Sequence, residues 1–372
     1  MQKNYLKCPI EWTEDVFGES STLKDVIEGL AVDGVKPRVL IVADANVVER
    51  IGSLGKKIGK YVQAHEIELV GHPVVMTSGE MIKTDNFNSV MVIANAIIQA
   101  KMRHDDVVLT IGGGSLLDVA GYAAAQVRGG VRIIRMPTTP SAMLDAAFVN
   151  NAAINTPMVK DAMQVKSVPD AVITDCNFAT MVLDGVWRAG FGEAVRIALA
   201  HDAGLMKKLG ELAEPYRKRD VEAMKAVISA AQAVRVKKGA TTIGMWAAKR
   251  MQAMSGGYKM PYGYAMVVGT CIDMAYAVEK GMVKSEECDE VMRILKEGGA
   301  LDGFSYARKV LLAGEFLLAG ISAWNLCAEK PGIELPHGIG KVKVQQEIEK
   351  EDKEVYRAVI AKLVALTKCV KV

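Results

Sequence analysis

A glycine-rich turn between an apolar run and a helix of small residues is the stretch of this chain with the clearest chemistry. Residues 107–122 read VVLTIGGGSLLDVAGY, which predicts a buried strand, a turn at 112–115 and the start of a helix. Glycine has no Cβ, so an anion can approach the backbone closely, and a helix N-terminus offers N–H groups and the positive end of its dipole. The pattern predicts an anion-binding turn, typical of a nucleotide pyrophosphate site.

The turn alone does not identify the nucleotide. Its spacing is not G-x-G-x-x-G, and no Gly-Lys-Ser/Thr follows as in a phosphate-binding loop of the Walker type. A turn of this kind can also be purely structural, so its neighbours must decide. Asp44 follows the apolar run 38–43, and Thr138 and Thr139 follow the run 131–136. Ligands of parallel sheets sit beyond the carboxyl ends of the strands, so we expect these side chains at one sheet edge with the turn.

The elements that must position these residues alternate in the first half of the chain. Helical apolar spacing over 87–100 lies among short β-branched runs, which favours a parallel, doubly wound sheet. The predicted strands are 38–43, 73–76, 107–111, 131–136 and 171–174. From Asp184 onward the strand runs end and helical periodicity dominates. Its clearest segments are 230–236, 245–254, 267–278, 286–295 and 355–366. We therefore expect an α/β domain over residues 1–183 and an all-α domain over 184–372.

Composition restricts the classes of partner. A net charge of +3 over 372 residues, with bases dispersed among acids, argues against a nucleic-acid partner. The six cysteines form no C-x-x-C pair of the kind that serves zinc or redox sites. The longest apolar stretch, 265–278, is too short to span a membrane and contains Asp273, and residues 1–5 lack the apolar core of a secretory signal. We expect a cytoplasmic protein without a membrane or nucleic-acid partner.

Taken in order, the motifs of the first half resemble those of the dehydroquinate synthase-like superfamily. This superfamily also includes iron-containing alcohol dehydrogenases, glycerol dehydrogenases and glycerol-1-phosphate dehydrogenases. The resemblance covers about residues 38–200 and is closest to dehydroquinate synthase in order and spacing. It is carried by Asp44-Ala45-Asn46, Gly79-Glu80 with Lys83, Gly112–Ser115 with Asp118 and Gly121, Pro137-Thr138-Thr139, Asp145, Ala153-Ile154-Asn155, Lys160 and Arg188–Glu193.

The resemblance implies NAD as cofactor, held in a cleft between an α/β dinucleotide-binding domain and an all-α domain, and a homodimer. Asp44 and Asn46 would contact the adenosine part, and Glu80 and Lys83 would surround its ribose and phosphate. The glycine turn would hold the pyrophosphate. The complete implied cofactor set is Asp44, Asn46, Glu80, Lys83, Gly113, Gly114, Ser115, Asp118, Thr138, Thr139 and Asp145, the last four on the nicotinamide side. Each of these alone could be a turn or cap residue, and their joint arrangement favours the cofactor.

The second half departs from the family at its metal site. Metal-dependent members hold the ion with an acidic residue, matched here by Glu193, and two downstream histidines. Met245 and Tyr262 stand at the histidine positions, and Tyr264 replaces a glutamate. A thioether and a neutral phenol are poor ligands for zinc or iron, so we predict no catalytic metal at this position. His201 and His337 remain outside alternatives, although a single histidine is more often a packing residue.

Substrate-facing positions also depart from dehydroquinate synthase. Val149-Asn150-Asn151 stands where Gly-Gly-Lys is expected. A protonated side chain can replace a metal as hydrogen-bond donor or general acid in hydride transfer. The candidates for this role are Lys160, Lys249, Tyr262 and Tyr264, with Glu193 as base or substrate orienter. Lys160 is the leading candidate because it matches a substrate-facing lysine of the family. Lys249 could instead be a solvated helix residue, and Tyr262 a packing aromatic.

Three functions remain open at this stage. The first is a metal-independent NAD(H)-dependent oxidoreductase acting on a small polyol, ketone or sugar-derived alcohol. The second is a sugar-phosphate cyclase that uses NAD transiently and eliminates phosphate. The third is a non-catalytic NAD-binding protein. The substrate and the choice between NAD and NADP are not given by the residues.

Overall fold

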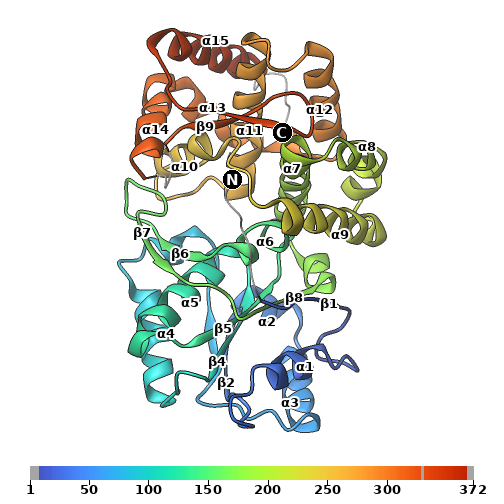
Figure 1. The fold of residues 1–372 in the computed structure, drawn as a ribbon, viewed down its shortest axis with the longest axis vertical. Helices are drawn as coiled ribbons and strands as arrows, with labels where there is room; N and C mark the ends of the chain where they lie inside the picture. The colour runs from blue at the N-terminus through green and yellow to red at the C-terminus, as the bar shows by residue number, and fades with distance from the viewer. Residues whose placement is uncertain (1–7, 328–330, 367–372) are drawn as a thin grey trace. The chain divides into compact units, whose positions relative to one another are not determined.

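The computed structural model describes residues 8–327 and 331–366, which are drawn as ribbon in Figure 1. They form two compact units. The α/β unit contains residues 8–156 and Asp161–Val182. The helical unit contains Pro157–Lys160 and the described residues from Leu183 onward. A four-residue segment of the N-terminal half therefore groups with the helical unit.

The α/β unit is built on a six-stranded parallel sheet with the order β1-β8-β5-β4-β2-β3. Its strands are β1 (Ile10–Thr13), β2 (Val39–Asp44), β3 (Val74–Met76), β4 (Val107–Gly112), β5 (Arg132–Pro137) and β8 (Ala171–Asp175). All residues of β2, β4 and β8 are buried, as expected of strands covered on both faces, and this burial explains their continuous apolar runs. The predicted doubly wound sheet is confirmed, with β1 as an additional edge strand.

Helices cover both faces of this sheet (Figure 1). They are α1 (Thr22–Gly29), α2 (Ala45–Arg50), α3 (Leu54–Ala64), α4 (Asn88–Gln99), α5 (Gly114–Gln126) and α6 (Pro140–Leu144). Side chains of α4 and α5, among them Ile93 and Val119, share one core with Leu40 and Val108 of the sheet. Short 3-10 turns η1 (Glu80–Lys83) and η3 (Ala146–Phe148) and the antiparallel hairpin β6 (Asn151–Ile154) and β7 (Met163–Lys166) complete the parts that matter for the site.

The helical unit is organised around α11, whose central residues are almost all buried. Helices α7, α10, α12, α13 and α15 contact it. The helices are α7 (Asp184–His201), α8 (Ala203–Arg217), α9 (Val221–Lys238), α10 (Met245–Met254), α11 (Tyr262–Glu279), α12 (Ser285–Glu297), α13 (Phe304–Leu312), α14 (Gly314–Cys327) and α15 (Lys350–Leu366), with the 3-10 turn η5 (Ala300–Gly303). The predicted helical segments all fall within these helices.

The expectation that the second half is entirely helical is wrong at one place. An antiparallel hairpin, β9 (Ile333–Pro336) and β10 (Val342–Gln345), lies between α14 and α15. Its strands are only four residues long and mix charged with apolar residues, so they give little strand signal in the sequence. Ile333 and Leu335 are buried, and Glu334 between them points to the other side of the strand.

Among the described residues, none of the helices is by itself long and apolar enough to cross a membrane. The sharply bent pair Ala300–Leu312 and Gly314–Leu326 passes a test of length and composition when the two are taken together.

Candidate functional site

The carboxyl ends of β2, β4 and β5 bring three of the predicted cofactor motifs to one sheet edge. Asp44 ends β2 and is buried, and its Oδ1 accepts hydrogen bonds from Asn46 N at 2.8 Å and Asn46 Nδ2 at 3.2 Å. It thereby caps the N-terminus of α2. Asn46 Nδ2 also donates to Ser78 Oγ at 2.8 Å. Asp44 and Asn46 are therefore held together as a polar pair at the end of β2.

The glycine turn joins β4 to the N-terminus of α5, as predicted. Gly113 caps α5 with an extended backbone (φ −74°). Close neighbours explain the glycines, because a Cβ on Gly113 would lie 3.3 Å from Thr139 Cγ2 and one on Gly114 would lie 3.1 Å from Ala146 Cβ. Thr139 and η3 therefore border the turn. The glycines leave the backbone of the turn at this sheet edge without side chains. A helix N-terminus of this form suits a pyrophosphate.

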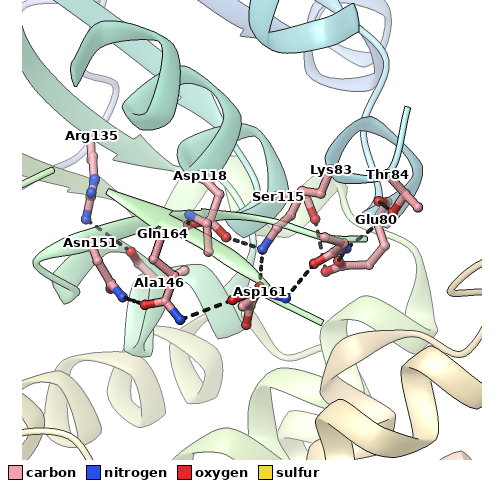
Figure 2. A network of polar contacts seen from close by, with 12 residues as sticks. Glu80, Lys83, Thr84, Ser115, Asp118, Arg135, Ala146, Asn151, Asp161 and Gln164 are labelled. Atoms are coloured by element: carbon pink, nitrogen blue, oxygen red, sulfur yellow. Dashed lines mark hydrogen bonds and ion pairs between the residues drawn. The ribbon is translucent and has the colours of Figure 1, made fainter. Parts of the chain in front are cut away.

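Glu80 lies beside the glycine turn and joins it to the β6–β7 hairpin. Ser115 Oγ donates to Glu80 Oε1, and Asn155 Nδ2 donates to Glu80 Oε2, both at 3.2 Å. The Asn155 Oδ1 accepts a hydrogen bond from Asp161 N at 2.9 Å. Figure 2 shows this network, in which η1, α5 and the hairpin meet. The structure therefore brings together Glu80 and Ser115, which are 35 residues apart in sequence.

Lys83 is held at the centre of the same network and is only 2% exposed. Its Nζ lies 2.5 Å from Asp118 Oδ2 and 2.6 Å from Asp161 Oδ1 (Figure 2). Burial disfavours the ammonium, but the carboxylates of Asp118 and Asp161 outweigh burial and raise the pKa of Lys83 well above its usual range. The ammonium is charged and bound by two carboxylates. A direct contact with cofactor stays a prediction, and the geometry favours a positioning role.

The threonines and Asp145 follow β5 on the nicotinamide side of the implied site. Thr138 is buried, and its N–H donates to Gly112 O at 3.1 Å. Thr139 Oγ1 accepts from Ala142 N at 3.3 Å and caps α6. Asp145 ends α6 and begins η3, where it is half-buried. These residues share an edge with the glycine turn, as expected.

Arg135 of β5 clamps the segment that carries Asp145, a role that was not predicted. Its guanidinium is 1% exposed and donates to four backbone carbonyls, including Val149 O at 2.6 Å and Ser167 O at 2.7 Å. Desolvation lowers the pKa of Arg135 to about 10. A buried arginine whose hydrogen bonds go to carbonyls fixes the backbone after β5, which holds Asp145 in place.

In the helical unit, Glu193 lies on α7 and is bound by Arg196, one turn further along. Arg196 Nε donates to Glu193 Oε2 at 3.1 Å, and Nη2 contacts Oε1, so the pair is bidentate. Arg196 Nη1 also donates to Thr241 O. Glu193 is 3% and Arg196 1% exposed. Arg196 was missed in the sequence, although an arginine three residues after a glutamate in a helix is a recognisable i,i+3 pair.

Two of the predicted catalytic residues meet. Lys160 is buried, and its Nζ lies 5.6 Å from the centroid of the Tyr262 ring, within range of a cation–π contact. Tyr262 is the first residue of α11. Both belong to the helical unit, since Lys160 is part of the segment Pro157–Lys160.

The remaining candidates lie elsewhere in the helical unit. Lys249 Nζ lies 5.5 Å from the centroid of the Trp324 ring on α14. Tyr264 is buried and stacks on Tyr306, with ring centroids 5.4 Å apart. Burial raises the pKa of Tyr264. The role of Tyr264 as a general acid stays a prediction.

The two outside histidines do not form a metal cluster. His201 ends α7 half-buried, and desolvation lowers its pKa. His337 is exposed in the β9–β10 turn. In the described ranges 8–327 and 331–366, no group of three His, Cys, Asp or Glu side chains is arranged to hold a metal ion.

Part of the chain that carries these motifs is similar in sequence to known proteins. Residues 73–186 match the family model for the N-terminal part of 3-dehydroquinate synthase. The chain is 26% identical to 3-dehydroquinate synthases of Halalkalibacterium halodurans over 214 residues and of Legionella pneumophila (strain Paris) over 237 residues. These matches cover 55% and 61% of this chain and 58% and 64% of the relatives, so they span about three-fifths of the relatives' length.

Solved structures share the fold over nearly the whole chain. A 2-epi-5-epi-valiolone synthase of Streptomyces hygroscopicus, with NAD+ and Zn2+ bound, aligns with a TM-score of 0.77 at 19% identity over 95% of this chain and 97% of its own. A 2-deoxy-scyllo-inosose synthase complexed with NAD+ and Co2+ gives 0.75 at 17% identity over 94% and 96%. A probable glycerol dehydrogenase from Sinorhizobium meliloti gives 0.66 at 16% over 97% and 98%. In part of its sequence and in its fold, the chain is similar to members of the dehydroquinate synthase-like superfamily.

Proposed function

We propose that this protein is a metal-independent, NAD(H)-dependent oxidoreductase that acts on a small polyol, ketone or sugar-derived alcohol. The observation that carries the proposal is the position of the Lys160 ammonium over the Tyr262 ring. Tyr262 stands where metal-dependent members of the family have a ligand histidine. A phenol beside a fixed cation offers proton transfer at the place where a metal would otherwise polarise an oxygen.

The cofactor edge of the α/β unit fits NAD. Asp44 offers a carboxylate to ribose hydroxyls, and the α5 N-terminus with its side-chain-free turn offers N–H groups to a pyrophosphate. Thr138, Thr139 and Asp145 would lie toward the nicotinamide. NAD(H), when bound, supplies the hydride acceptor or donor. Lys83 and Arg135 would hold Asp118 and the Asp145 segment in place.

Residues of the helical unit would donate and accept the proton that accompanies hydride transfer. In the direction of carbonyl reduction, the Tyr262 hydroxyl donates its proton to the developing alkoxide oxygen. In the direction of alcohol oxidation, the phenolate takes the hydroxyl proton back. The Lys160 ammonium offsets the negative charge of the phenolate in both directions. Glu193 orients the cationic neighbour Arg196 and is not required as a base.

A direct test is net formation of NADH with alcohol substrates. We expect Tyr262→Phe to lower kcat by about 10²–10⁴-fold, the usual contribution of a positioned acid or base. Lys160→Met should lower kcat as well. Matched controls are Tyr306→Phe, an exposed ring, and Lys309→Met, an exposed side chain in the last turn of α13. Unchanged turnover in Tyr262→Phe would contradict the assignment.

The cyclase alternative is supported by the named relatives. They include 3-dehydroquinate synthases, and a 2-epi-5-epi-valiolone synthase and a 2-deoxy-scyllo-inosose synthase that hold NAD+. The rebuilt positions around Val149–Asn151 argue against dehydroquinate synthesis itself. Release of inorganic phosphate from a sugar phosphate, without net NADH, would favour the cyclase. Tight NAD binding by calorimetry without turnover of any substrate would favour a non-catalytic protein.

We also propose a cytoplasmic homodimer, as the family resemblance implies. Light scattering coupled to size-exclusion chromatography measures the mass in solution, and a monomeric mass would reject the dimer.

A further inference from the structure

We infer that Arg196 takes the place of the divalent metal ion as the cation of the site in the helical unit. This inference rests on the proposed function, and it concerns a residue that the family motifs do not assign in this chain. Glu193 corresponds to the acidic metal ligand of metal-dependent members. In this chain its carboxylate is bound instead by a guanidinium from the same helix.

The geometry leaves the carboxylate unsuited to a metal ion. Both Glu193 oxygens face Arg196, with Nε on Oε2 at 3.1 Å and Nη2 on Oε1. A divalent ion on either oxygen would lie within a few ångströms of the guanidinium, in a region where both side chains are almost fully buried. Like charges at that separation in a poorly solvated region repel strongly. Arg196 and a metal ion are therefore mutually exclusive partners of Glu193.

The residues at the two histidine positions of the family's metal site do not supply the missing metal ligands. Met245 begins α10 and Tyr262 begins α11. A thioether and a neutral phenol add no charge to balance a divalent ion, and zinc and cobalt sites in proteins use imidazole, thiolate or carboxylate. The donor set of this chain does not fit the metal that the solved neighbours hold.

Arg196 is fixed in a way that suits a permanent electrophile. Nη1 donates to Thr241 O, and the Thr241 hydroxyl donates to Glu334 Oε2 at 2.7 Å. Glu334 also accepts from Thr242 N. The β9–β10 hairpin thus locks the turn before α10, which in turn holds the guanidinium. A guanidinium is charged at all working pH values and needs no reorganisation when negative charge develops nearby.

The first experiment measures metal directly and does not depend on turnover. The full-length protein is purified without chelators, and zinc, iron and cobalt are quantified by mass spectrometry of the elements. We expect far less than one ion per chain, and a melting temperature unchanged by EDTA or by added Zn2+ or Co2+. Stoichiometric metal that is lost in Glu193→Gln would overturn the inference and the metal independence of the proposed function, and would leave NAD(H)-dependent turnover of an alcohol to be decided by the activity assay.

The second experiment tests the charge itself. Arg196→Ala should lower kcat/KM by about 10²–10³-fold, the usual effect of removing one preorganised donor. Arg196→Lys should retain part of the activity. Added guanidinium ions should restore part of the activity of Arg196→Ala but not of Tyr262→Phe. The matched control is Arg188→Met, on the same helix and paired with Asp302.

The outcomes separate the two proposals. Wild-type turnover that is retained in Arg196→Ala would overturn the role of Arg196. If Arg196→Ala does not fold, Arg196→Lys and the wild-type metal content still decide. If the wild-type protein turns over no alcohol, the proposed function fails, while the metal content continues to test the Glu193–Arg196 pair.

Discussion

Lys83 is a buried ammonium whose environment decides what its removal would do. It lies between Asp118 and Asp161, which are themselves 22% and 15% exposed. Lys83→Met would leave these two carboxylates facing each other without a cation. We expect a loss of about 3–5 kcal/mol in the free energy of unfolding, measured by urea denaturation near neutral pH. Lys60→Met, on the exposed face of α3, is the matched control and should change stability little.

The pH dependence of this contribution has a definite sign. The carboxylates raise the pKa of Lys83 above its unfolded value of about 10.4, so the folded state binds the proton more tightly. The stabilisation is fully present below that value and is lost as pH rises above it. The stability difference between wild type and Lys83→Met should therefore be flat from neutral to mildly alkaline pH. A difference that decreases on going from pH 7 to pH 9 would contradict this assignment.

The pKa of Asp273 in α11 is also raised, but by burial, whereas neighbouring carboxylates raise the pKa of Lys83. Burial raises its pKa to about 7, although it accepts hydrogen bonds from Trp246 Nε1 at 2.8 Å and Gly244 N at 2.6 Å. Because the folded pKa exceeds the unfolded value of about 3.9, stability from the neutral acid is present below the unfolded value and is lost as pH rises through 7. Relative to Asp273→Asn, wild type should lose stability up to about pH 7.5 and then run parallel.

The Asn variant itself should cost about 1–3 kcal/mol above pH 7, because one amide oxygen cannot accept from every donor around Asp273. Urea denaturation at a series of pH values measures both effects. Asp289→Asn, an exposed residue of α12, is the control and should show no such pH trend. A pH-independent difference between wild type and Asp273→Asn would show that the acid does not titrate in this range.

At the scale of elements, the contact of α10 with α11 depends on two glycines. A Cβ on Gly269 would clash with the carbonyl oxygen of Gly244, and Gly244 has a positive φ of 73°. Neither backbone can move without separating the helices that carry Met245 and Tyr262. We expect Gly269→Ala to cost about 3 kcal/mol or more, measured by thermal or urea unfolding. Gly59→Ala, in the exposed interior of α3 with open space around it, should instead stabilise by about 0.5–1 kcal/mol. Equal effects of the two substitutions would argue against a close helix contact.

The elements that could be predicted from the sequence are those with a strong period or continuous burial. Strands β2, β4, β5 and β8 are rich in β-branched and other apolar residues, and α10 matches the predicted helix 245–254 at both ends. The hairpin β9–β10 could not be recognised, because its short strands carry charges at alternate positions. The cofactor edge followed from where the strands end. Arg135 could not be predicted, because arginine is normally exposed and its burial here depends on carbonyls that the tertiary fold brings near. The Glu193–Arg196 pair could be recognised from its i,i+3 spacing, but its burial could not.

At the scale of the whole molecule, the implied cofactor residues and the proton-transfer candidates belong to different units. Asp44, Glu80, Ser115 and Asp145 lie in the α/β unit, whereas Glu193 and Tyr262 lie in the helical unit. Lys160 lies between the two strands of the β6–β7 hairpin of the first unit but groups with the second. A two-unit chain of this kind can unfold in more than one step. The effect of a ligand on the melting temperature must therefore be measured for each unfolding transition.

NAD binding should therefore raise the melting temperature of the transition that unfolds the α/β unit. At a concentration 100 times the dissociation constant, the ligand adds about 2.7 kcal/mol of stability, which corresponds to a shift of several degrees.

Asp44 and Asp202 offer a matched pair for the test, because each caps a helix with its carboxylate, Asp44 on Asn46 N and Asp202 on Leu205 N. Either change to alanine should cost about 1 kcal/mol through the lost cap. Only Asp44→Ala should also reduce the NAD-dependent shift, because only Asp44 is proposed to contact the adenosine ribose. Calorimetric scans with and without NAD measure both effects in one series. Equal NAD-dependent shifts in the two variants, or none in wild type, would remove the adenosine site from the edge of β2.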